Sequence, residues 1–74
     1  MWVIQLLRRD GGAPEYVADQ YGTTVDLDEA RTCLTIQSVI GLVRRWQKFI
    51  KSNENSHGKT FFKVLAREAE IRLK

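Results

Sequence analysis

Four basic side chains in the segment GLVRRWQKFIK, residues 41–51, are the clearest candidates for a binding chemistry in this sequence. On a helix they fall on or beside one face, with no acidic side chain among them. Clustered cations attract phosphate groups, through release of condensed counterions, and they also attract acidic protein surfaces. A solvated helix face is the commonest role of such a cluster, followed by an acidic protein partner and then by nucleic acid. The candidate partner-binding residues are Arg44, Arg45, Lys48 and Lys51.

The other reactive side chains do not form a recognisable catalytic or metal site. Cys33 would need a positioned base to act as a nucleophile, and the only histidine, His57, falls in a polar segment. We therefore interpret Cys33 as a small buried hydrophobe. The acidic residues Asp26, Asp28 and Glu29 lack the glycine and closing glutamate of a calcium loop. No pair of residues has the spacing of zinc ligands. We predict no enzyme activity, no catalytic residue, no metal and no cofactor.

The length and composition predict a single small domain over residues 1–74. The hydrophobic share of 43% and the charged share of 28% are typical of a folded soluble chain. One cysteine cannot form a disulfide within the chain, which favours a reducing compartment. No apolar stretch approaches the ~20 residues of a transmembrane helix. The apolar run at the N-terminus precedes its charges, unlike a signal peptide. We expect a cytoplasmic protein without a membrane segment.

The charge is distributed unevenly along the chain. Residues 1–33 contain six acidic and three basic side chains, whereas residues 34–52 contain four basic side chains and no acidic one. This asymmetry favours an acidic partner or self-association more than the small net charge of +3 does.

The first third of the chain predicts two strands joined by a tight turn. Residues 2–7, WVIQLL, form an apolar run that suits a strand covered on both faces. The sequence Asp10-Gly11-Gly12 supplies residues that tolerate a positive φ, as a hairpin turn requires. Residues 15–22 predict the second strand, which Gly22 ends.

A loop, a short strand and a helix follow. Residues 23–31 predict a loop with one helical turn, capped by Asp26, with Glu29 at the capping-box position. Residues 32–34 predict a short third strand, and Thr35 can act as the N-cap of a helix that ends at residue 51. Residues 52–58 break the helical pattern and predict a loop. The helix carries an apolar stripe that should face a core, formed by Ile36, Val39, Ile40, Val43, Trp46, Phe49 and Ile50.

The last segment, residues 60–74, fits either a helix or a strand. Residues 65–74 are mostly good helix formers, but residues 68–74 alternate between polar and apolar side chains without a miss. We choose the strand, because it gives the N-terminal hairpin further partners. The predicted fold class is α+β, a four-stranded and mainly antiparallel sheet of β-β-β-α-β order with one amphipathic helix packed on one face.

This layout resembles small uncharacterised bacteriophage and prophage proteins. They share an opening hairpin, a T-x-D-x-x-E-A loop before a short strand, a capped helix and a closing strand. The matching residues here are Thr24, Asp26, Glu29 and Ala30, with Thr35 as the cap. The two adjacent arginines of the helix are not part of that pattern. The resemblance implies a phage accessory protein, in the cytoplasm of the host, that acts on a host protein. It implies no catalytic residue and identifies no particular partner.

The sequence also indicates self-association. If the helix covers one face of the sheet, apolar side chains remain on the other face, and such patches mark interfaces that are often symmetric. We therefore expect a protein-binding accessory protein that forms a homodimer. The alternative is a small nucleic-acid-binding module that uses the basic helix face; residues 14–24 also resemble part of a helix-turn-helix. The residues predicted for self-association are Trp2, Val3, Leu7 and Phe61.

Overall fold

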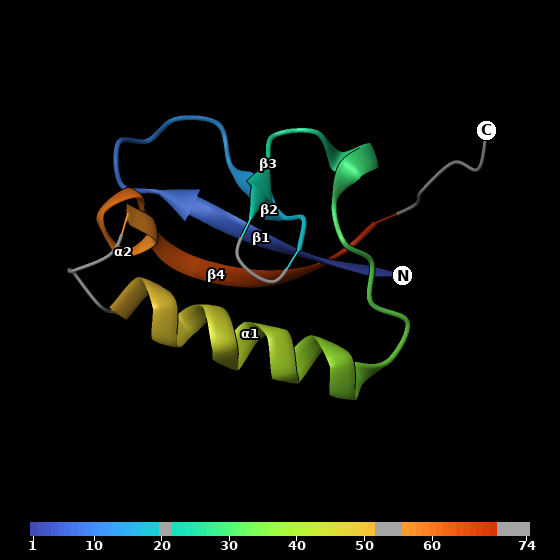
Figure 1. Cartoon of the computed structure of the whole chain (residues 1–74). Helices are drawn as coiled ribbons and strands as arrows, with labels where there is room; N and C mark the ends of the chain where they lie inside the picture. The colour runs from blue at the N-terminus through green and yellow to red at the C-terminus, as the bar shows by residue number, and fades with distance from the viewer. Residues whose placement is uncertain (20–21, 52–55, 70–74) are drawn as a thin grey trace.

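A four-stranded antiparallel sheet with one long helix across one face forms the protein (Figure 1). The computed structural model describes residues 1–19, 22–51 and 56–69. The sheet order is β3-β2-β1-β4 and every pairing is antiparallel. The α+β architecture predicted from the sequence is confirmed. The strands are β1 (Trp2–Arg8), β2 (Glu15–Val17), β3 (Thr23–Thr24) and β4 (Phe61–Glu68).

β1 is a central strand, which explains its unbroken apolar run. It pairs with β2 on one side and with β4 along its whole length on the other. Its residues 3–6 are all buried, because α1 covers one face and other side chains cover the opposite face. The pairing of β1 with β4 contains a bulge, since Leu7 lies opposite Lys63 but Arg8 lies opposite Phe61. Phe62 is therefore an extra residue in β4.

The hairpin turn between β1 and β2 has the predicted chemistry. Gly11 has a φ of 76°, a backbone conformation that favours glycine. The Gly12 amide donates to the Asp10 carboxylate at 2.8 Å. β2 is shorter than the predicted strand, because the chain already turns at Ala18, whose amide donates to the Gly22 carbonyl at 2.9 Å.

The third strand lies earlier in the chain than predicted. It is Thr23–Thr24, which pairs with β2, and residues 32–34 form no strand of their own. Cys33 makes one antiparallel bridge with Trp2, with N···O distances of 2.7 and 2.9 Å. The helical turn predicted within residues 23–31 is a 3-10 turn, η1 (Leu27–Glu29). Its N-cap Asp26 accepts a hydrogen bond from the Asp28 amide. This cap is confirmed.

The long helix α1 (Ile36–Lys51) begins at its predicted cap. The Thr35 hydroxyl accepts a hydrogen bond from the Ser38 amide at 3.2 Å, and the Thr35 carbonyl accepts one from Val39. The helix packs on the sheet through three buried side chains, with Leu42, Val43 and Phe49 partly buried beside them. The buried residues of α1 are Val39, Trp46 and Ile50.

The apolar stripe of α1 is wider than the surface that the sheet covers. Ile36 is 59% exposed and Ile40 is 45% exposed, so the prediction that they face the core is wrong. Successive residues advance by about 100° around a helix, which places both isoleucines and Gln47 on one row. Gln47 lines a groove with Phe62 and Val64. The row therefore lies on the side of α1 next to β4, the edge strand, beyond which no further strand of the described chain covers the helix.

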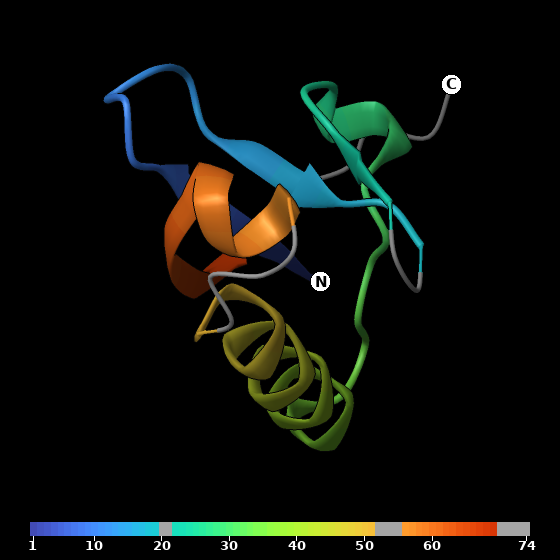
Figure 2. The ribbon, with the colours of Figure 1, turned by 60° about the vertical axis from the view of Figure 1, so that its left-hand side comes forward.

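A second helix, α2 (Ser56–Thr60), replaces part of the loop predicted for residues 52–58. Residues 52–55 lie outside the described residues. α2 lies between the end of α1 and the start of β4 (Figure 2). The His57 ring packs against Trp46, with ring centroids 4.8 Å apart, and against Phe61 at 6.2 Å. These aromatic contacts order a segment whose sequence alone is typical of a loop.

β4 confirms that the chain after residue 60 forms a strand. It ends at Glu68, and residues 70–74 of the predicted alternating segment lie outside the described residues. No helix in the described part of the chain is long and apolar enough to cross a membrane.

Candidate partner-binding surfaces

The four predicted cations all lie exposed on α1, and we call this set, Arg44, Arg45, Lys48 and Lys51, the basic face. Trp46, between Arg45 and Gln47 in sequence, is fully buried, so the two-sided character predicted for the helix is present. Arg44 and Lys48 are one helical turn apart. Lys48 and Lys51 are in the last turn, where cations offset the negative end of the helix dipole.

The basic face contains no acidic side chain from its own helix. Among the described residues, Arg44, Lys48 and Lys51 form no ion pair, since the ion pairs there involve Arg8. Their positive charge is therefore directed to solvent. The acidic residues of η1 lie on the opposite side of the sheet from α1 (Figure 1). The charged side chains of α1 are therefore all basic, whereas those of η1 are all acidic.

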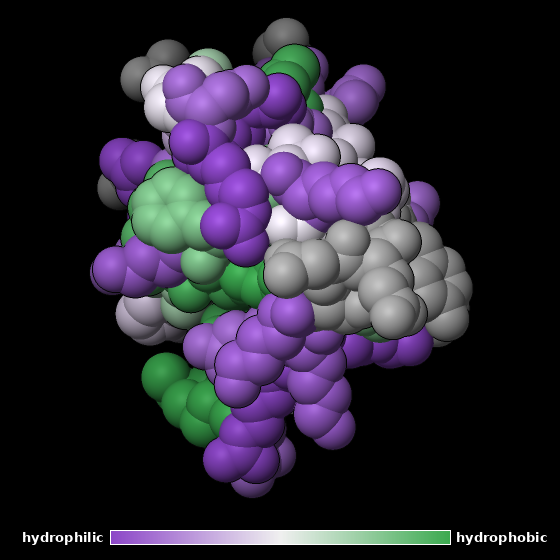
Figure 3. Space-filling model, turned by 90° about the vertical axis from the view of Figure 1, so that its left-hand side faces the viewer, coloured by the Kyte–Doolittle hydropathy of each residue, from purple (hydrophilic) through white to green (hydrophobic). Residues whose placement is uncertain are grey.

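A groove of about 420 Å³ lies where α1 ends and β4 begins. Figure 3 shows this end of the molecule, where hydrophilic side chains predominate and hydrophobic patches lie among them. Arg9, Lys51 and Lys63 line the groove together with Phe62, which is 52% exposed. An exposed aromatic ring beside three cations is a feature that the sequence analysis did not predict. The adjacent pair Phe61 and Phe62 was the available signal, because consecutive residues of a strand face opposite ways.

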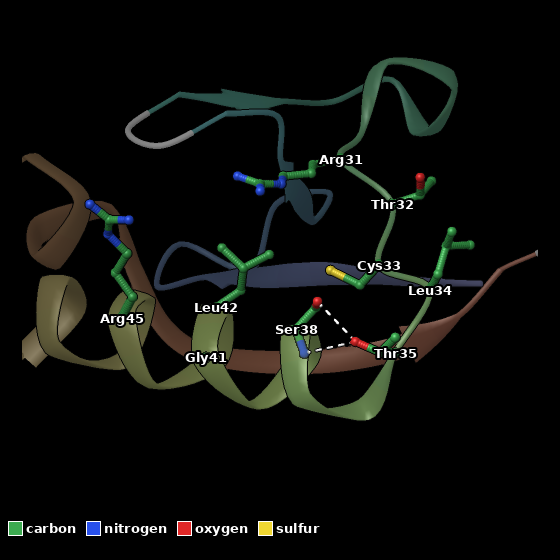
Figure 4. A pocket seen from close by; sticks show the side chains of 9 residues that line it. All are labelled: Arg31, Thr32, Cys33, Leu34, Thr35, Ser38, Gly41, Leu42 and Arg45. Carbon is green, nitrogen blue, oxygen red and sulfur yellow. Dashed lines mark hydrogen bonds between the residues drawn. The ribbon is translucent and has the colours of Figure 1, made fainter.

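A second groove, of about 720 Å³, separates the segment 31–35 from the first half of α1 (Figure 4). Leu42 points from the helix toward Cys33, and the Thr35 hydroxyl donates to Ser38 Oγ at 2.9 Å. Cys33 is buried, as interpreted from the sequence, and His57 packs among aromatic rings near the other end of α1. The two therefore do not form a thiol–imidazole pair.

Arg8 forms a charged cluster with two carboxylates at the hairpin. Its guanidinium donates to Asp10 at 3.0 Å and to Glu15, and Glu15 also accepts from the Thr23 hydroxyl at 2.9 Å. The hydrogen bond from Arg8, with a further one from the Gly12 amide, lowers the pKa of Asp10 to about 2. The same carboxylates raise the pKa of Arg8. This cluster joins β1, β2 and β3, and its role is to hold the turn.

The residues predicted for self-association do not form an exposed patch. Val3 is 0% exposed and Phe61 is 2% exposed, whereas Trp2 and Leu7 are partly buried. Val3 faces away from α1, but it is covered on that side, where Leu27 lies beside it. Phe61 belongs to the core cluster under α1. The expectation that these two residues offer an apolar surface is wrong.

The structure exposes a different apolar surface. Ile36, Ile40 and Phe62 are exposed, and Val43 is partly buried on the same side of α1. The signal in the sequence was the width of the stripe, which spans more of the helix than a single sheet edge can cover. No three His, Cys, Asp or Glu side chains gather into a possible metal site within the described residues.

Comparison of the chain with protein-family models, with curated proteins and with solved structures gives no match. The resemblance to phage proteins therefore remains a prediction.

Proposed function

We propose that the protein is a small non-enzymatic binding protein that acts through protein contacts, and that the basic face of α1 binds an acidic surface of a partner protein. The observation that supports this function is the exposed set of cations without an acidic neighbour on the helix. A rigid helix holds these charges at fixed spacing. Charge complementarity of this kind steers encounter and selects the partner.

The charge distribution favours a protein over a long nucleic acid. The net charge is only +3, and Asp26, Asp28 and Glu29 present acidic groups on the other side of the molecule. A long polyanion is attracted by the cations of α1 but is repelled by these acidic groups. Four cations would give nucleic-acid binding that weakens steeply as salt is added.

Nucleic acid is the second candidate, because of the groove beside the end of α1. Phe62 can stack on a base, and Arg9, Lys51 and Lys63 can contact phosphates around it. Stacking of a base on an aromatic ring contributes about 1–3 kcal/mol in single-stranded complexes. This reading requires a single strand, since a base in a duplex is not available for stacking.

The two functions are separated by fluorescence anisotropy with two probes, an oligo-glutamate peptide and a single-stranded oligonucleotide, at low and at physiological salt. We expect binding of the peptide to be lost in the double variant Arg44→Glu with Lys48→Glu. The matched control, Arg31→Glu with Lys59→Glu, has the same net charge and should keep it. If the protein binds the oligonucleotide more tightly than the peptide, and Phe62→Ala abolishes that binding, the second candidate is established. Binding of neither probe at low salt would contradict both.

A further inference from the structure

We infer that the free edge of β4, with the apolar ridge of α1 beside it, is the contact surface for a second copy of this chain. The apolar ridge comprises Ile36, Ile40 and Val43. In this arrangement the β4 strands of two copies pair antiparallel across a two-fold axis, so that the two sheets become one and both helices lie on the same face. The inference does not depend on the function proposed for the basic face.

The backbone of β4 offers hydrogen-bonding groups at this edge. Trp2 exchanges both of its backbone hydrogen bonds with Cys33, on the side of β1 away from β4. Alternation in an antiparallel ladder then turns the groups of Val3 toward β4, and the Ala69 amide donates to the Met1 carbonyl in agreement with this. On β4 itself, the N–H and C=O groups of Val64, Ala66 and Glu68 point away from β1. No other strand of the described chain pairs with them.

Charge favours the register centred on Ala66 over the two registers next to it. With Ala66 opposite Ala66 of the second copy, Lys63 lies opposite Ala69 and Arg67 lies opposite Leu65, so no like charges face each other directly. A shift by two residues one way places Lys63 opposite Arg67. A shift by two residues the other way places Arg67 opposite Arg67 of the second copy. Like charges directly opposite destabilise a strand pair, so the register centred on Ala66 is favoured over these two.

The same register places an acidic group beside a basic one. Glu68 alternates with Arg67 and so lies on the helix side of β4, opposite Val64 of the second copy. Val64 shares a groove with Lys51 of its own chain. The Glu68 carboxylate of each copy therefore approaches Lys51 of the other. Two such contacts form, because the axis repeats every interaction.

The apolar ridge is positioned to meet its own copy over the joined strands. Paired strands lie about 4.8 Å apart, whereas packed helices need about 8–10 Å between their axes. The helices fit only if each lies inward of its edge strand, and α1 does contact both β4 and β1. The exposed side chains of Ile36 and Ile40 then fill the space between the helices. Ala66, small and exposed on the helix side of β4, leaves room beneath them.

Sedimentation equilibrium over protein concentrations from micromolar to several hundred micromolar tests this association. We expect a dimer of twice the 8.6 kDa chain mass at high concentration. Ile40→Glu places a charge in the ridge. Ala66→Pro removes a backbone N–H that points away from β1, so the hydrogen bonds between β1 and β4 are kept. Each variant should weaken dimerisation at least tenfold. The control is Val25→Glu, at an exposed apolar residue that lies outside β4 and α1, and it should leave dimerisation unchanged. A monomer throughout, or a dimer that neither variant weakens, would overturn the inference.

Cross-linking gives a second readout that does not depend on affinity. Residues in a hydrogen-bonded antiparallel pair have Cα atoms about 5.5 Å apart, which a disulfide can bridge. In a Cys33→Ala background, Ala66→Cys should oxidise to a covalent dimer at low protein concentration. Asp28→Cys, exposed on η1, is the matched control and should remain largely monomeric. Equal cross-linking at both positions would contradict the edge pairing.

Discussion

Phe61 and Phe62 are consecutive residues with opposite environments: the first is buried in the core and the second is half exposed beside the end of α1. The bulge opposite Arg8 separates them. We predict that Phe61→Ala lowers the free energy of unfolding by about 3–5 kcal/mol, because it leaves a cavity. Phe62→Ala, the matched control, should change it by less than about 0.5 kcal/mol. Urea denaturation measures both, and similar losses in the two variants would contradict this placement.

The cap of α1 can be tested in the same way. Thr35→Ala removes the oxygen that accepts from the Ser38 amide and should cost about 1 kcal/mol. Thr35→Asn retains an acceptor at that position and should cost less. A loss as large with Asn as with Ala would show that the hydroxyl acts through some other contact.

Two glycines should respond to alanine with opposite signs. Gly41 lies within α1 and an added Cβ meets nothing within 4 Å, so Gly41→Ala should raise the free energy of unfolding by about 0.5–1 kcal/mol. Gly11 has a positive φ, so Gly11→Ala should strain the hairpin turn and lower stability. Thermal unfolding measures both shifts. Destabilisation by Gly41→Ala would mean that the exposed side of α1 is covered in solution.

The Arg8–Asp10 contact predicts a pH dependence of stability at acid pH. The pKa of Asp10 is about 2 in the folded protein, below its ordinary value of 3.8. A lowered pKa contributes stability that is complete above about pH 4 and is lost as the pH falls toward 2. The stability difference between the wild type and Asp10→Asn should therefore shrink over that range. An NMR titration of the Asp10 carboxyl that gives a midpoint near 3.8 would refute it.

Local patterns predicted the elements whose signal lies within a few residues. The apolar run of β1, the turn at Gly11, and the caps at Asp26 and Thr35 all occur as expected, because steric preference and capping depend on near neighbours. The third strand was misplaced because Thr23 and Thr24 carry no apolar alternation. Their pairing depends on β2, which a local pattern does not reveal.

The candidate surfaces likewise include features that local sequence predicts and features that depend on the whole fold. The exposure of the basic face follows from helical periodicity alone. The exposure of Ile36 and Ile40 depends on where the sheet ends, which is a property of strand order, and the exposure of Phe62 depends on a bulge. The aromatic packing that forms α2 around His57 joins residues from three elements and left no periodic signal.

The pairing of β1 with β4 joins one of the first segments of the chain to one of the last. Bringing them together closes a loop of about fifty residues before any of their contacts is gained, which makes collapse slow for so small a chain. A ribosome that has released only β1, β2 and α1 holds a chain with an unfinished core. Folding of this protein during its own synthesis must therefore wait until β4 has emerged.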